Sequence, residues 1–144
     1  MSRATQAADL YPYLRARLWL PLPFTPTGGV VSPFSANGAV LSAPIARDMA
    51  PRRLECGVFP VATNNGTNYW TITLTLQAAG GGGTTAQGSV NTSALAAGQW
   101  DSSLVLTSFT TPTWDATSFA IVYLSIVKTG TPGNLYLNPV LWVS

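Results

Sequence analysis

The 144 residues suit a single domain, and only 8% of them are charged, against a usual share of about a quarter. With 13 glycines, 11 prolines and many Thr and Ser residues, the composition favours an all-β chain that hides its surface or solvates it with hydroxyls and amides. A net charge of +2 with scattered arginines argues against a surface built to neutralise phosphates, so we expect no nucleic-acid partner.

The first third of the chain is rich in proline, with seven of the 11 prolines before Cys56. Proline cannot donate to a strand ladder, so this part is expected to be extended and irregular, with a helical turn near residues 5–10. Its many apolar side chains distinguish it from disordered segments and require a partner surface. We interpret residues 1–53 as an apolar arm that lies across its own domain, a neighbouring subunit or another protein, with partner contacts at Leu10, Tyr11, Tyr13, Leu14, Arg15, Arg17, Leu18, Trp19, Leu20 and Phe24.

Neither a leader nor a membrane segment is expected in this part of the chain. The opening is polar and lacks a continuous apolar core, which is atypical of a signal peptide. The most apolar stretch, LWLPLPFTPTGGVV, is interrupted by three prolines and is shorter than the roughly 20 residues of a membrane helix. We therefore expect no membrane partner and a protein made in a cytoplasm.

Residues 54–144 have the pattern of a β domain. In NYWTITLTLQ, apolar residues alternate with threonines, which predicts a strand with one buried and one wet face. An Asn-Gly pair precedes it, so residues 54–62 and 69–77 are expected to form a hairpin. The glycine run at residues 80–83 is expected to be a flexible connection, followed by a short strand in SLVLTSF. Short strands with Gly and Pro between them predict an antiparallel β-sandwich or jelly-roll-like barrel.

The residues needed for common catalytic and metal sites are scarce. The chain has no histidine and one cysteine, which excludes Ser-His-Asp and Cys-His systems and the usual zinc ligand sets. Asp101 and Asp115 each follow a tryptophan, but we interpret them as Asx-type turns beside packed tryptophans rather than as a catalytic pair. Arg52 and Arg53 are left with two interpretations, contact with an acidic partner or surface ion pairs. We predict neither an enzyme nor a cofactor nor a metal site.

The five tryptophans are not expected to play one role. Trp70 lies on the apolar face of its strand and is expected in the core. Trp100 and Trp114 fall at strand edges or loops, where each is either a packing residue or a platform for a sugar ring. Trp19 and Trp142 are expected to be packing anchors, and the lone Cys56 a buried small apolar residue.

The last 26 residues contain two strands, at residues 119–127 and 135–143, around the turn KTGTPGN. Apolar residues occupy both faces of each strand, although a sandwich buries only one. We expect the second faces to meet another subunit or the arm, with interface candidates Ile121, Tyr123, Tyr136, Val140 and Trp142.

The Pro-rich arm, the Thr-rich strand NYWTITLTL, the ending SIVKTGTPGNLYLNPVLWV and the low charge resemble the small capsid decoration, or head-stabilising, proteins of tailed bacteriophages, particularly those of thermophilic long-tailed phages. The resemblance covers mainly residues 57–144. It implies a homotrimer of jelly-roll-like domains on the outside of the capsid, with arms that grip the major capsid protein and with no active site. It also implies a place on the virion surface after assembly in the host cytoplasm.

An alternative of a different class remains. Trp100, Trp114 and the hydroxyl-rich loops are also typical of a receptor- or carbohydrate-binding domain of a phage tail fibre or tail tip. Sequence patterns do not decide whether the arm docks in cis or in trans, or whether the doubly apolar strands serve a dimer or a trimer.

Overall fold

Two antiparallel sheets face each other in the computed structural model, which describes residues 20–22, 25–26 and 36–144. Within these residues one short 3₁₀ turn, η1 (Ala79–Gly81), accompanies nine strands, so the expected all-β sandwich is confirmed. The strands are β1 (Leu20–Leu22), β2 (Thr25–Pro26), β3 (Gly38–Pro44), β4 (Pro51–Pro60), β5 (Tyr69–Ala78), β6 (Thr84–Asn91), β7 (Asp101–Leu106), β8 (Phe119–Thr129) and β9 (Leu135–Val143).

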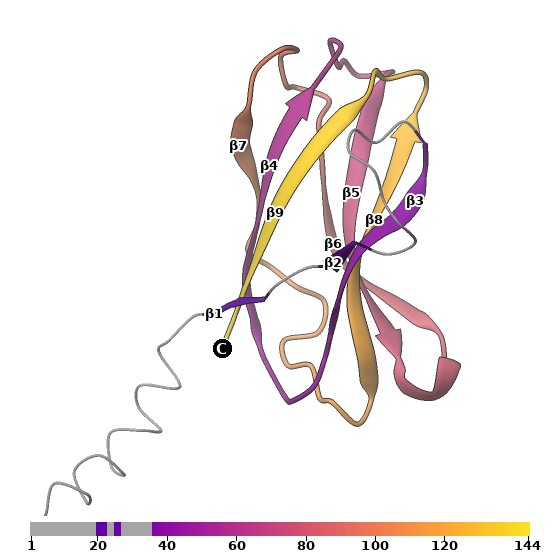
Figure 1. Ribbon diagram of the computed structural model, residues 1–144, viewed down its shortest axis with the longest axis vertical. Helices are drawn as coiled ribbons and strands as arrows, with labels where there is room; N and C mark the ends of the chain where they lie inside the picture. The colour runs from indigo at the N-terminus through magenta and orange to yellow at the C-terminus, as the bar shows by residue number, and fades with distance from the viewer. Residues whose placement is uncertain (1–19, 23–24, 27–35) are drawn as a thin grey trace, which may run out of the picture.

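The strand order is that of a jelly roll. One sheet, sheet A, has the order β1-β9-β4-β7, and the other, sheet B, has the order β2-β3-β8-β5-β6 (Figure 1). Apart from the short β2, the pairs are nested: β1 pairs with β9, β3 with β8, β4 with β7, and β5 with β6. Such nesting is equivalent to one long hairpin rolled into two sheets, which is the double Greek-key arrangement of jelly rolls.

The hairpin expected from residues 54–62 and 69–77 is wrong, because its two strands lie in different sheets. β4 pairs with β7 and β9, whereas the next strand, β5, pairs with β6 and β8. In the same way β8 belongs to sheet B and β9 to sheet A. The loops at residues 61–68 and 130–134 therefore cross between sheets, about 10 Å apart in such sandwiches. Alternation indicates which face of a strand is buried, but it does not identify the neighbouring strand.

Part of the region that we assigned to the arm lies in the sandwich. β3 pairs with β8 through residues 38–44, and β4 begins at Pro51, so the expected boundary after residue 53 falls inside a strand. The backbone of β1 also joins sheet A, where Leu20 is the partner of Val143. These segments belong to the sandwich because each adds a row of backbone hydrogen bonds to one of its sheets. The helical turn expected near residues 5–10 lies outside the described residues.

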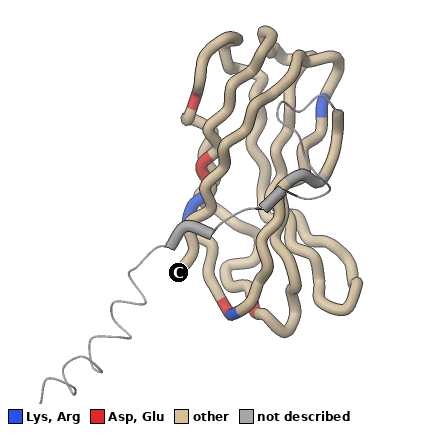
Figure 2. Tube along the Cα trace, viewed as in Figure 1, with Lys and Arg blue, Asp and Glu red and all other residues tan. Residues whose placement is uncertain are grey.

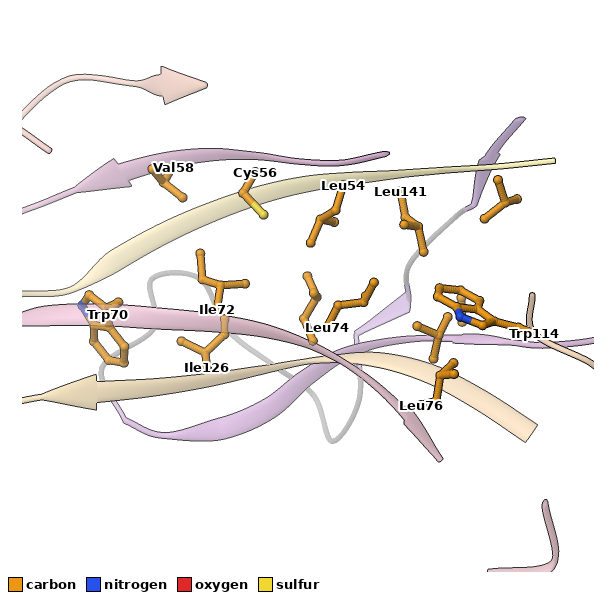
Figure 3. Packing of buried hydrophobic residues seen from close by; sticks show 14 of the residues in the cluster. Leu54, Cys56, Val58, Trp70, Ile72, Leu74, Leu76, Trp114, Ile126 and Leu141 are labelled. Atoms are coloured by element: carbon orange, nitrogen blue, oxygen red, sulfur yellow. The ribbon is translucent and has the colours of Figure 1, made fainter. Parts of the chain in front are cut away.

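The core is formed by alternate residues of the central strands (Figure 3). As expected, Trp70 is buried, and so are the inward residues of β8. The Cys56 thiol is fully buried, and desolvation raises its pKa to about 12, so the expectation of a buried small apolar residue is confirmed. Fully buried side chains from both sheets interdigitate between the layers: Leu54, Val58, Ile72, Leu74, Leu76, Val122, Leu124, Ile126, Leu135 and Leu141.

The burial pattern predicts unequal effects of the same substitution at two valines. Val122 is completely buried between the sheets, whereas Val61 is 49% exposed in the loop after β4. We expect Val122→Ala to lower the free energy of unfolding by about 2 kcal/mol, because it removes buried methyl groups and leaves a cavity, and Val61→Ala to change it by less than about 0.5 kcal/mol. Urea denaturation of both variants measures this. Equal losses would contradict the assignment of the β8 inner face.

Candidate interaction surfaces

The outer face of sheet B is broad and carries no charge. β3, β5 and β6 contain no charged residue, and β8 contains only Lys128, near its end. Threonines of β5 lie beside the outer residues of β8, with the half-buried Thr71 opposite Val127 and the buried Thr75 opposite Tyr123. Along the β8 row Ile121 is 39% and Val127 is 44% exposed. Hydroxyls and isolated apolar side chains therefore cover this face, and Figure 2 shows how few charged residues lie on the described chain as a whole.

The outer face of sheet A is arranged differently. Aligned pairs on β4 and β9 place Arg53 opposite Trp142, Glu55 opposite Val140, Gly57 opposite Asn138, and Phe59 opposite Tyr136. Arg53 and Glu55 form an ion pair, with Nε 2.5 Å from Oε1, and Arg52 donates from Nε to the Ser144 hydroxyl at 2.7 Å. Of the two interpretations left open for the arginines, the surface ion pair is the one observed at Arg53.

The five interface candidates lie on two different surfaces. Ile121 and Tyr123 are on the outer face of sheet B, whereas Tyr136, Val140 and Trp142 are on that of sheet A. The four other than Ile121 are half-buried within this chain. One contact between two identical patches would therefore cover only one of the two sets.

Three aromatic rings surround a hollow at the end of sheet A. Phe59, Trp100 and Tyr136 line a volume of about 290 Å³. The Phe59 ring centre lies 5.7 Å from that of Trp100, with the planes at 59°, and 6.0 Å from that of Tyr136, with the planes at 81°. Trp100 is 61% exposed, so its ring is open to solvent. Reasoning from sequence singled out Trp100 and Tyr136 separately but missed Phe59, although its position between the buried Val58 and Pro60 marks it as outward-facing.

Trp114 lies in the core, so the alternative that its ring is a surface platform for a sugar is wrong. Its side chain is completely buried, and Nε1 donates to Oε1 of the buried Gln87 at 3.3 Å. Its backbone forms an isolated bridge with Met49, with N···O distances of 2.9 and 2.7 Å. Gln87 also accepts from Thr111 N at 2.9 Å, so the buried amide oxygen is satisfied. Gln87 was not anticipated from sequence because it interrupts the hydroxyl-rich β6 without an apolar pattern.

Both aspartates form the expected Asx-type turns. Asp101 accepts from the backbone N and the hydroxyl of Ser103, at 2.7 and 2.5 Å, and these bonds lower the pKa of its carboxyl group. Asp115 accepts from the hydroxyls and backbone N–H groups of Ser118 and Thr117, which hold the pKa of its carboxyl group far below its ordinary range. The tryptophan before Asp115 packs as expected, whereas the one before Asp101 is exposed.

Most of the predicted arm contacts lie outside the described residues. Of that set only Leu20 falls within them, in β1. Among residues 20–22, 25–26 and 36–144, no three His, Cys, Asp or Glu side chains gather where they would hold a metal ion. The same part of the chain contains no helix that is both long and apolar enough to cross a membrane.

Comparisons with protein-family models, with curated proteins and with solved structures find no match for this chain. The fold therefore rests on the strand pairing described above, and jelly-roll domains serve unrelated functions.

The Asp115 turn predicts a pH dependence of stability. Because the folded-state pKa lies below the ordinary value of 3.8, the ionised carboxylate stabilises the fold above that value, and this contribution is lost as the pH falls below it. We expect wild type to be more stable than Asp115→Asn near neutral pH, since asparagine keeps the acceptor oxygen without the charge. The difference should shrink below about pH 4. Urea denaturation from pH 7 to pH 2 measures it, and a difference independent of pH would contradict the turn's role.

Proposed function

We propose that this chain is a structural assembly subunit that packs against copies of itself through the outer face of sheet B. In the specific form implied by the resemblance, it is a homotrimer on the outside of a phage capsid, bound to the major capsid protein. Its function is then to stabilise the shell by burying surface, and its place is the virion.

The uncharged outer face of sheet B is the observation that carries this proposal. Protein surfaces usually carry many Lys, Glu, Asp and Arg side chains, and the burial of these charges in a contact costs free energy. Here the face formed by β3, β8, β5 and β6 offers only hydroxyls, amides and apolar side chains, with Ile121 and Val127 protruding. Such a face loses little ionic hydration when a second protein covers it, and its hydroxyls can form hydrogen bonds across the contact.

The area of this face indicates that it does not act alone. Strands of ten residues, as in β5, are about 33 Å long, and four neighbouring strands span roughly 19 Å, so the flat face measures on the order of 600 Å². A stable interface buries about 800 Å² per partner. The N-terminal residues 10–19, which are mostly apolar but include Arg15 and Arg17, would supply the remaining area, as the resemblance implies for an arm.

The second set of candidates supports a contact to the shell. Val140 and Trp142 lie on sheet A, opposite the face assigned to self-association, so they stay available when that face is covered. A subunit of a shell must bind both its own copies and the underlying capsid protein. Two separate surfaces on one domain suit that double requirement.

A charge on the face of sheet B should disrupt self-association. We expect the full chain to sediment as an oligomer and Val127→Lys or Ile121→Lys to sediment as a folded monomer at the same micromolar concentration, because a lysine in the contact leaves an unpaired charge. The matched control is Val61→Lys, which replaces a valine of similar exposure off this face. Sedimentation velocity measures the mass, and circular dichroism checks the fold.

A monomeric wild type, or Lys variants that assemble normally, would contradict self-association through sheet B. The capsid role is tested separately by co-sedimentation with assembled phage shells. Removal of residues 1–19 leaves every described strand in place, unlike removal of residues 1–53, which would take away β3. Shell binding that survives the shorter deletion unchanged would contradict the role of the arm.

A further inference from the structure

The hollow of Phe59, Trp100 and Tyr136, named here the aromatic hollow, has the form of a small-ligand site. The ring planes of Trp100 and Tyr136 are tilted against that of Phe59, at 59° and 81°, so the three rings border an open hollow on the surface. A volume of about 290 Å³ is close to the lower end of small-molecule sites, roughly 300 Å³. It admits one or two rings of a small ligand but not a helix or a strand.

The backbone segments that carry the three rings are held in place without a ligand. Phe59 and Tyr136 occupy directly opposed positions on adjacent strands of sheet A. The loop that carries Trp100 is attached to the end of β4 by a hydrogen bond from Gly98 N to Pro60 O at 2.9 Å. On the other side of Trp100, Ser103 N donates to the Asp101 carboxylate at 2.7 Å, which fixes the start of β7. A site prearranged in this way loses little conformational freedom on binding.

The surroundings of the aromatic hollow favour a neutral polar ligand. Next to it on the same face, Gly57 stands opposite Asn138, so the exposed Asn138 amide has no side chain across from it. An amide offers both donors and an acceptor. The nearest charged group, the Asp101 carboxylate, already accepts two hydrogen bonds from Ser103. Farther along, the charges of Arg53 and Glu55 are paired with each other. A ligand that lies on the rings and extends toward Asn138 thus meets apolar ring faces and then a neutral hydrogen-bonding group.

We propose that the aromatic hollow binds a neutral sugar ring, with an apolar C–H face of the pyranose against Trp100 and its hydroxyls directed toward Asn138 and the Tyr136 hydroxyl. A pyranose combines a flat C–H face with a rim of hydroxyls, which matches this division of apolar and polar groups. An anionic ligand would lack a cationic partner in the three lining residues. This activity goes beyond assembly, and its site lies on sheet A rather than on the face of sheet B used for self-association.

Binding can be measured on the full chain with defined probes. These are a glycan array for breadth, and methyl β-D-glucopyranoside, methyl β-D-galactopyranoside and N-acetylglucosamine at millimolar concentration for nuclear magnetic resonance titration. The indole N–H signal of Trp100, assigned as the one that disappears in Trp100→Phe, should shift on addition of at least one sugar. Trp100→Ala should weaken that binding by roughly tenfold or more, as is usual for a central tryptophan.

Two control variants test whether sugar binding belongs to the aromatic hollow. Trp142→Phe changes a tryptophan on the same sheet face but outside the hollow and should leave sugar affinity unchanged. Val127→Lys should also retain sugar binding, so failure of the assembly role and failure of this one are distinguishable. If Trp100→Ala is unfolded, the shift of the assigned wild-type indole decides the question alone.

No binding on the array together with an unmoved Trp100 indole signal would overturn the proposal. A Trp100 shift with choline chloride but with no sugar would also overturn it, because the rings would then bind a quaternary ammonium through cation–π contact.

Discussion

The mutual burial of the inner faces of the two sheets is the constraint on which the rest of this molecule depends. A chain with no disulfide and one described ion pair is stabilised mainly by apolar burial between β4 and β9 on one side and β5 and β8 on the other. All four strands are interior members of their sheets, and most of their inward residues are fully buried. Everything outward, including both candidate surfaces, is placed by this packing.

The same constraint explains which predictions from sequence succeeded. The alternation in β5 correctly predicts that Trp70, Ile72, Leu74 and Leu76 are inside, because a period of two determines the face of a residue. The alternation does not identify the strand that pairs with β5. The Asn-Gly pair before β5 does not identify it either, because such a pair occurs in hairpins and also in loops between sheets. The rolled topology is decided by long-range pairing, such as that of β3 with β8, and no local signal reports it.

The candidate sites show the same division. The alternation in β9 predicts that Tyr136, Val140 and Trp142 share one face of the strand. The structure places all three on the outer face of sheet A. The contact between Phe59 and Trp100 could not be predicted from the sequence, because the two residues are 41 positions apart. They meet only because of where the loop before β7 lies. The composition shows that charged residues are few. Only the strand order shows that the outer face of sheet B carries none of them.

Trp100 and Trp114 show most directly why function at this surface follows from tertiary placement. Each precedes an aspartate that accepts hydrogen bonds from the following Ser or Thr residues, so the local chemistry is nearly the same. Trp114 is drawn inside because its backbone bridges Met49 and its indole meets Gln87. The loop before Trp100 is instead attached to the end of β4, which leaves the ring beside Phe59 on the outer face. One Trp-Asp turn thus completes the core, while the other provides the most exposed large apolar side chain among the described residues.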